Sequence, residues 1–310
     1  MHRSNGRVAT TMALAWVVAF AQLAGACAAK RPPSTVRTTT ALVTLQTEIV
    51  TILAGEAEIR PGLKLANRTT PENRSEVRTY LARLLTQFGL AAKRQAYSAE
   101  GENVYAVLSC GRPSAELVVV GAHYDSSRGS PGANDDATGV AAVAAVAEQL
   151  VRVKRRTRDV AFVFFDEEER GLRGSRAFAQ WLKDEKRPVH SVHTIDQMGW
   201  DQDGDRAIEL ELPYEGAREL YAAGAAALKM TIQMHVTTEA GSDHSAFRRL
   251  GFKAVGLTEE YRNKDTTPFI HRPGDTAKTV DFVYLASTTR LLVNVIETLA
   301  TSQSVPKPGA

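Results

Sequence analysis

The chain has 310 residues, of which 44% are hydrophobic and 24% charged, values that exclude a disordered, collagenous or coiled-coil protein. The formal net charge is +3; without the first 26 residues Arg3 and Arg7 are lost, which leaves 36 basic against 35 acidic residues. This near-neutral balance argues against a nucleic-acid partner, and only two cysteines exclude a disulfide-stapled scaffold.

The N-terminal segment is predicted to be an export signal. Residues 1–7 are polar and carry two arginines, residues 8–29 are mostly apolar, and small residues occupy 24–26. This order is typical of a secretory signal peptide over residues 1–26, with an uncleaved membrane anchor as the alternative. We therefore expect an exported protein, located in the periplasm or at the cell surface.

Cys27 stands where a bacterial lipoprotein carries its acylated cysteine. The preceding Leu-Ala-Gly-Ala resembles such a processing site, although Ala24 replaces the larger residue expected three positions before the cysteine. Membrane anchoring through a lipidated Cys27 and ordinary signal cleavage nearby both stay open. If Cys27 is lipidated, Cys110 has no disulfide partner and is expected at a half-buried strand end. Residues 27–40 are polar and Pro-rich and are interpreted as a tether.

The remaining chain alternates between helix and strand patterns. Apolar residues three and four positions apart indicate helices, and continuous or alternating apolar runs indicate strands. In chain order we predict helices at 41–53 and 75–88, strands at 92–97, 103–108 and 117–121, a helix at 140–151, a strand at 160–165, a helix at 172–183, strands at 192–195 and 208–212, a helix at 215–228, strands at 232–236 and 254–257, and a helix at 282–300.

This alternation predicts an α/β fold with a mixed, mostly parallel central sheet and helices on both faces. No repeat and no second linker interrupt it. We expect a single catalytic domain over residues 41–302, followed by a short tail at 303–310.

Polar segments follow several of the predicted strands, at the carboxyl ends where doubly wound sheets build their sites. After the strand at 117–121, His123 and Asp125 are two residues apart, so alternation turns both side chains to one side. A ligand histidine usually donates its second ring N–H to a carboxylate, and Asp125 is a candidate for that carboxylate. Alone, a strand-end histidine is more often structural.

The next predicted helix is preceded by Asn134, Asp135 and Asp136. Aspartate at a helix start is an ordinary cap that also suits the helix dipole. Two acids exceed what a cap requires, however, and the nearby Gly132 and Gly139 favour close approach of the backbone to a bound group.

Four consecutive acids, residues 166–169, follow the apolar strand at 160–165. They form either a solvated acidic turn or a site where a cation relieves the repulsion among carboxylates. Asp196 ends a later strand in the same way. His271 lies in a loop rich in proline and glycine before the last helix, with Asp275 as its candidate carboxylate partner.

Two histidines and several carboxylates, without a cysteine, form a donor set that suits zinc better than manganese or cobalt. So many carboxylates are more than one tetrahedral zinc uses. They favour a pair of metal ions about 3.5–4 Å apart, bridged by a carboxylate.

Together these segments resemble the zinc exopeptidases that include bacterial leucyl aminopeptidase and glutamate carboxypeptidase II. Five motifs match in the family's order between residues 117 and 276: His-x-Asp, Gly-Ala-Asn-Asp-Asp-Ala-Thr-Gly-Val, Glu-Glu-x-Gly-Leu-x-Gly-Ser, Ile-Asp-x-Met-Gly and His-x-x-x-Asp-Thr. The resemblance implies the phosphorylase/hydrolase-like fold of these enzymes and two Zn²⁺ per chain.

The resemblance also implies the metal ligands. His123 and Asp196 would hold one zinc, Glu169 and His271 the other, and Asp135 would bridge the two. The family often has a cis peptide bond after the bridging aspartate.

Two further roles follow from the resemblance: Glu168 would be the general base, and Asp125 would orient its neighbouring ligand histidine. The family's Glu-Glu pair stands one residue before a glycine, here Gly171, which selects residues 168 and 169. Asp166 and Glu167 are then structural residues at the strand end.

The implied activity is that of a metallo-exopeptidase, most simply an aminopeptidase that acts on a peptide or small amide. A carboxypeptidase or dipeptidase would need a cation for the free carboxylate, and Arg262, Lys264 or Arg272 could supply it. A glutaminyl cyclase on the related fold and a non-catalytic binding lipoprotein stay open as well.

The segment 241–244 resembles a family loop beside the substrate pocket, where Asp243 could equally cap a helix. Some aminopeptidases of this type carry an oxyanion-supporting tyrosine just upstream, whereas Glu239 stands near that position here. The oxyanion donor, the side-chain preference and the oligomeric state are therefore left open.

Overall fold

The computed structural model describes residues 39–302. The predicted signal peptide, Cys27, most of the tether and the tail at 303–310 lie outside the described residues. The last two residues assigned to the tether, Thr39 and Thr40, form the first turn of a helix.

An eight-stranded mixed sheet forms the centre of the described chain, in the spatial order β1-β2-β4-β3-β5-β8-β6-β7. The neighbours β4-β3, β3-β5, β5-β8 and β6-β7 are parallel, and β1-β2, β2-β4 and β6-β8 are antiparallel. The prediction of a mixed, mostly parallel sheet is confirmed. The strands are β1 (Lys93–Ala96), β2 (Glu102–Leu108), β3 (Leu117–His123), β4 (Asp159–Phe165), β5 (Val189–Ile195), β6 (Ile208–Glu211), β7 (Met234–Thr237) and β8 (Ala254–Thr258).

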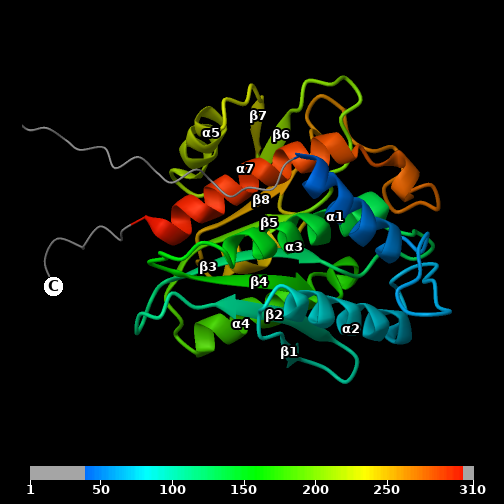
Figure 1. The fold of residues 1–310 in the computed structure, drawn as a ribbon, viewed down its shortest axis with the longest axis horizontal. Coiled ribbons are helices and arrows are strands. Elements are labelled where there is room, and N and C mark those ends of the chain that lie inside the picture. Colours follow the sequence, from blue (N-terminus) through cyan, green and yellow to red (C-terminus); the bar gives the residue numbers. More distant parts are fainter. Residues whose placement is uncertain (1–38, 303–310) are drawn as a thin grey trace, which may run out of the picture. The chain divides into compact units, whose positions relative to one another are not determined.

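Helices cover both faces of the sheet, as predicted. Figure 1 shows α7 running across the strands with α1 and α3 beside it, and the main apolar core lies under these helices and α2 and α5. A smaller core joins α4 and α6 to the other face. The helices are α1 (Thr39–Leu53), α2 (Pro71–Gln87), α3 (Thr138–Leu150), α4 (Arg173–Asp184), α5 (Ala217–Ala227), α6 (His244–Arg249) and α7 (Phe282–Thr301).

Local sequence explains where several elements begin. Helix α2 starts four residues before the predicted position because Thr70 accepts the backbone N–H of Asn73 as an N-cap and Pro71 occupies the first helical position. Helix α7 starts after Asp281, whose carboxylate accepts two backbone N–H groups. Strand β4 is buried along its whole length, as its continuous apolar run predicts.

The parallel strands β3, β4, β5 and β8 all end at the same edge of the sheet. The register pairs His123 with Phe165 and Ile195 with Leu257, so the segments that follow these strands meet there. This edge is where a doubly wound sheet places its site.

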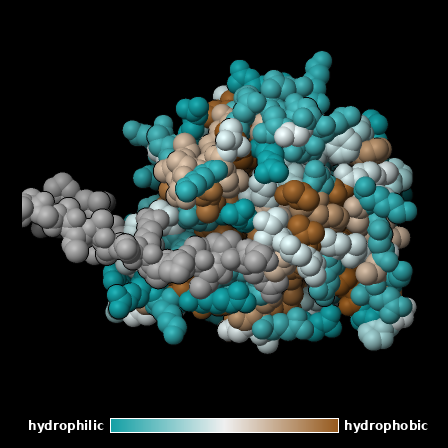
Figure 2. All heavy atoms as spheres, turned by 45° about the horizontal axis from the view of Figure 1, so that its top comes forward, coloured by the Kyte–Doolittle hydropathy of each residue, from teal (hydrophilic) through white to brown (hydrophobic). Residues whose placement is uncertain are grey.

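On the face shown in Figure 2, the described residues are mostly hydrophilic and form separate hydrophobic patches. Among residues 39–302, the large hydrophobic side chains that are well exposed are Val236 and Val283. Cys110 follows β2 as a half-buried free thiol, in line with its predicted place at a strand end. Within residues 39–302, every helix is too short or too polar to cross a lipid bilayer.

Candidate metal centre and active site

His123 is the last residue of β3, and its imidazole is buried. Its Nδ1 lies 3.4 Å from Oδ1 of Asp125. The Asp125 carboxylate also accepts the backbone N–H groups of Glu168 and Glu169, at 3.0 and 3.3 Å. One buried carboxylate therefore joins the histidine to the acidic turn and leaves Nε2 of His123 facing the centre of the site.

Asp135 lies between the two histidines that the sequence singled out. Its Oδ1 is 3.1 Å from Nε2 of His123, and its Oδ2 is 3.1 Å from Nε2 of His271. The peptide bond between Asp135 and Asp136 is cis, as the family resemblance implied. One oxygen of this carboxylate thus faces His123, and the other faces His271.

Asp136 has the capping role that was one interpretation of this segment. Its Oδ1 accepts the backbone N–H of Gly139 in the first turn of α3 and that of Gln197 after β5. Its carboxylate lies among the ligand atoms of His123 and Asp196, a proximity that the sequence did not predict. Asp136 therefore ties the loop carrying Asp196 to the start of α3.

The four acids after β4 divide into two pairs. The buried Asp166 and Glu167 form ion pairs with Arg74, and Asp166 also contacts Arg78. The other pair turns to the site: Glu169 Oε2 lies 3.3 Å from Nε2 of His271, and the Ser127 hydroxyl donates to it. Glu168 lines the same pocket.

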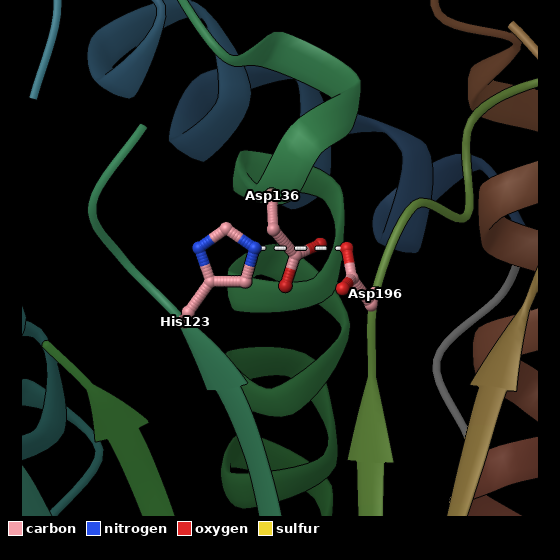
Figure 3. A group of neighbouring side chains, drawn as sticks. All are labelled: His123, Asp136 and Asp196. Atoms are coloured by element: carbon pink, nitrogen blue, oxygen red, sulfur yellow. Dashed lines mark ion pairs between the residues drawn. The ribbon is translucent and has the colours of Figure 1, made fainter. Parts of the chain in front are cut away.

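Asp196 follows β5, and its Oδ1 lies 3.6 Å from Nε2 of His123. Figure 3 shows these two side chains turned toward each other from neighbouring strand ends, with the Asp136 carboxylate beside them. The five residues predicted as ligands therefore form two adjacent groups, one around His123 and Asp196 and one around Glu169 and His271, with Asp135 shared between them.

Burial and neighbouring carboxylates raise the pKa values of several groups in the site. The contact with Asp135 raises the pKa of His271 to about 9. Burial raises the pKa of Glu169 to about 7, and the neighbouring Asp135 adds to the shift. Burial also raises the pKa of Glu168 to about 10, with Asp243 and Asp196 adding to it. The protons take the place that cations fill when carboxylates crowd together.

The residues fit a pair of divalent metal ions. Three buried polar atoms of this region make no hydrogen bond, although the first two face each other at ionic distance: Nε2 of His123, Oδ1 of Asp196 and Oε1 of Glu169. Imidazole nitrogen and carboxylate oxygen are ligands that zinc accepts. Leaving such atoms unpaired is costly, so their convergence is expected of a metal site.

A pocket of about 540 Å³ opens over these residues. Its lining is strongly acidic, and among residues 39–302 no lysine or arginine contributes to it. The lining residues are Asp135, Glu168, Glu169, Gly171, Leu172, Asp196, Gln197, Glu209, Glu211, Glu239, Gly241, Ser242, Thr258, Tyr261, Ile270 and His271.

Asp275 has a different role from the one predicted. Its carboxylate accepts the backbone N–H groups of Asn134 and Asp135, at 2.7 and 3.1 Å, instead of pairing with His271. The prediction was wrong because a spacing of four residues suggested a local contact, whereas the fold directs the carboxylate to the entry of α3. Asp275 thereby fixes the backbone that carries Asp135.

The segment 241–244 does lie beside the pocket. Gly241 and Ser242 line it, and Asp243 stands at the N-cap position of α6, without a side-chain capping hydrogen bond. The buried Asp243 carboxylate contributes to the raised pKa of the neighbouring Glu168, after burial itself.

Arg68 is the main supporting residue that sequence reasoning missed. Its guanidinium is fully buried and donates to backbone carbonyls in the loops around the site, at Leu53, Tyr124, Asp125, Pro131 and Gly132. Burial lowers its pKa, and the carboxylates of the site oppose that shift. An isolated arginine in a loop carries no pattern that could have revealed this role.

Comparison with known proteins places the chain in a family. Residues 103–296 match the sequence profile described as Peptidase family M28. The chain belongs to peptidase family M28. The chain is 32% identical over 186 residues to the probable lipoprotein aminopeptidase LpqL of Mycobacterium tuberculosis, covering 56% of this chain and 37% of LpqL. It is 26% identical over 200 residues to aminopeptidase YwaD of Bacillus subtilis, covering 62% of this chain and 43% of YwaD.

The chain thus spans less than half of the length of these two relatives. Solved structures share the fold: LapA aminopeptidase of Legionella pneumophila superposes with a TM-score of 0.72 at 19% identity, covering 89% of this chain and 78% of LapA. Glutaminyl cyclase of Porphyromonas gingivalis gives a TM-score of 0.67 at 17% identity, covering 83% of this chain and 98% of the cyclase.

Proposed function

We propose that this M28 chain is a two-zinc metallo-exopeptidase that acts as an aminopeptidase. The observation that carries the proposal is the position of Asp135, which presents one oxygen to His123 and the other to His271. A carboxylate that bridges two metal ions has this arrangement. In the proposal Asp196 completes the first site and Glu169 the second.

When bound, zinc supplies a Lewis acid that polarises the scissile carbonyl and makes water acidic near neutral pH. The chain's own residues prepare the site for it. Asp125 lies at Nδ1 of His123 and so keeps Nε2 free to bind. Asp275 and Arg68 hold the backbone around Asp135, so the bridging carboxylate keeps its orientation.

Glu168 is the proposed general base. Its carboxylate lines the pocket, and no arginine or lysine lines that pocket within residues 39–302. It accepts a proton from the attacking water and then passes that proton to the leaving amine. Asp125 accepts the backbone N–H of Glu168 and therefore positions it.

The pocket lining favours a substrate with a free amino terminus. A carboxypeptidase needs a cation to receive the terminal carboxylate of its substrate. Arg262 lines a separate adjoining depression, and Lys264 and Arg272 are exposed and lie outside the lining of the main pocket. An acidic pocket attracts an ammonium group and repels a carboxylate.

Glutaminyl cyclase activity is the second candidate, supported by the fold likeness to the P. gingivalis enzyme, of which 98% is covered. An N-terminal glutamine peptide separates the two. The proposal predicts released glutamine, whereas appearance of pyroglutamate with the rest of the peptide intact would favour the cyclase.

Export is proposed as well, with residues 1–26 as a signal peptide. Lipid attachment at Cys27 is supported by the lipoprotein named among the relatives. Replacement Cys27→Ser tests it, because loss of the chain from the membrane fraction is expected only for a lipid anchor.

The decisive test of the activity is Glu168→Gln, which keeps the shape of the side chain and removes the base. Hydrolysis of aminoacyl anilides should fall about 10²–10⁴-fold while the zinc content stays at two per chain. N-acetylated substrates and a chelator serve as controls, and both should abolish hydrolysis. A variant that retains full activity would exclude Glu168 as the base.

A further inference from the structure

Three glutamates of the pocket wall have no part in the proposed metal site. Glu209 and Glu211 lie on β6, and Glu239 lies in the loop after β7. Residues 209 and 211 are two apart on a strand, so their side chains point to the same face, toward the pocket. The wall formed by these three residues, called here the glutamate wall, adjoins the metal ligands.

The glutamate wall is built into the sheet. β6 pairs with β8, and the register places Glu211 opposite Gly256. A Cβ atom at Gly256 would lie 2.5 Å from Oε2 of Glu211 and 2.6 Å from Nδ1 of His244. Glycine at this position therefore makes room for the carboxylate. His244 Nδ1 lies 3.4 Å from Glu211, and its Nε2 donates to the backbone carbonyl of Glu239.

Within residues 39–302, the side chains of His235 and Arg262 act electrostatically on the buried Glu209. Glu209 accepts the backbone N–H of Arg262, which lines the adjoining depression. Glu211 lies beside the buried His244, whose pKa is lowered by burial, and the exposed Glu239 pairs with no lysine or arginine in the described chain. Burial raises the pKa of Glu211 to about 8, and the carboxylates of Asp196, Glu209 and Glu239 add to this shift.

Acidic side chains would outnumber basic ones around the pocket even with metal bound. Two divalent ions would suit the four carboxylates of Asp135, Glu168, Glu169 and Asp196, and the glutamate wall adds three more acidic side chains to the lining. The α-ammonium group of a substrate supplies one positive charge. A second cation on the substrate would find complementary carboxylates in the remaining wall.

Few apolar side chains are available to receive a leucine-like residue. Leu172 and Ile270, with the ring of Tyr261, are the large apolar groups in the lining, within the part of the chain that the structure describes. Carboxylate side chains therefore outnumber large apolar side chains in the lining of the pocket.

We propose that the glutamate wall is a specificity subsite for substrates whose first residue carries a second cation, that is, an N-terminal lysine or arginine. This proposal rests on the proposed aminopeptidase function. Glu211 and Glu239 are the residues assigned to the side-chain cation, and Glu209 supports them through its place beside Glu211 on β6.

The test compares lysyl with norleucyl 4-nitroanilide, because norleucine has the carbon chain of lysine without the ammonium group. We expect kcat/KM to favour lysine roughly ten- to hundredfold, the strength of one or two charge-assisted contacts. Glu211→Gln and Glu239→Gln should each lower this ratio, and the double variant should bring it near one. Glu215→Gln, an exposed glutamate outside the pocket, is the matched control and should leave the ratio unchanged.

A binding measurement separates this proposal from the catalytic one. Lysinamide and norleucinamide are titrated into zinc-loaded Glu168→Gln protein, in which the proposed base is absent. Tighter binding of lysinamide, lost with the double glutamine replacement, supports the subsite even if no anilide is hydrolysed. Equal binding of the two amides, or hydrolysis of the norleucyl substrate at least as fast as the lysyl one, would overturn it.

Discussion

The acidic turn after β4 contains two pairs of carboxylates with opposite surroundings. Asp166 and Glu167 are buried against the guanidinium groups of Arg74 and Arg78. Glu168 and Glu169 follow directly and face a pocket that holds other carboxylates. An acid paired with buried arginines has a structural role, whereas an acid that faces other carboxylates is suited to a metal site. The charges around each acid therefore separate the two roles more clearly than its place in the sequence.

Removing Arg74 would test the structural role of Asp166 and Glu167. In Arg74→Met, Asp166 and Glu167 lose their shared buried cation, although Asp166 keeps Arg78 and Glu167 keeps more exposed arginines, so the free energy of unfolding should fall by about 3 kcal/mol, the lower end for a broken buried pair. Chemical denaturation measures the change. Arg173→Met removes an exposed partner of Glu167 and should cost less than about 1 kcal/mol. Equal losses for the two variants would contradict the comparison.

Replacing Asp125 would test how the acidic turn is joined to His123, because this carboxylate contacts His123 and accepts the backbone N–H groups of Glu168 and Glu169. Asp125→Asn should weaken zinc affinity about 10–100-fold, as expected when the partner of a ligand histidine is lost. Competition with a chromogenic chelator measures the affinity. An unchanged affinity would mean that Asp125 has no part in orienting the ligand.

The proposed ligands Glu169 and His271 should release protons when the protein binds metal. In metal-free protein the pKa of His271 is about 9 and that of Glu169 about 7, both above their usual values. A ligand must lose its proton to bind, so at pH 7 zinc binding should release about one proton or more. Apparent affinity should rise with pH until about 9 and then level off. Calorimetry in buffers of different ionisation enthalpy measures the number of protons released. Absence of proton release would argue against His271 as a ligand.

Much of the site could be read from the sequence, because each predicted ligand lies close to the carboxyl end of a strand or in a loop with a distinctive motif. Parallel strands end at one edge, which brings residues such as His123 and Asp196 together although they lie far apart in the sequence. The distinction between Asp166 and Glu168 also followed from motif register. These inferences depended on local patterns.

Features that depend on long-range packing could not be read in this way. The role of Arg68 depends on its hydrogen bonds to backbone carbonyls of three other segments, which only the folded chain places beside it. Strand β6 was expected, but the pairing that turns Glu211 over Gly256 and into the pocket was not. Asp275 was assigned to its near neighbour, whereas it holds a backbone segment 140 residues earlier.

The most direct test of the central claim is a crystal structure of the zinc-loaded protein with anomalous scattering at the zinc edge. The account predicts two ions about 3.5–4 Å apart, with Asp135 bound to both. His123 and Asp196 should complete one coordination sphere, and Glu169 and His271 the other. A single ion, or two ions that do not share Asp135, would contradict it.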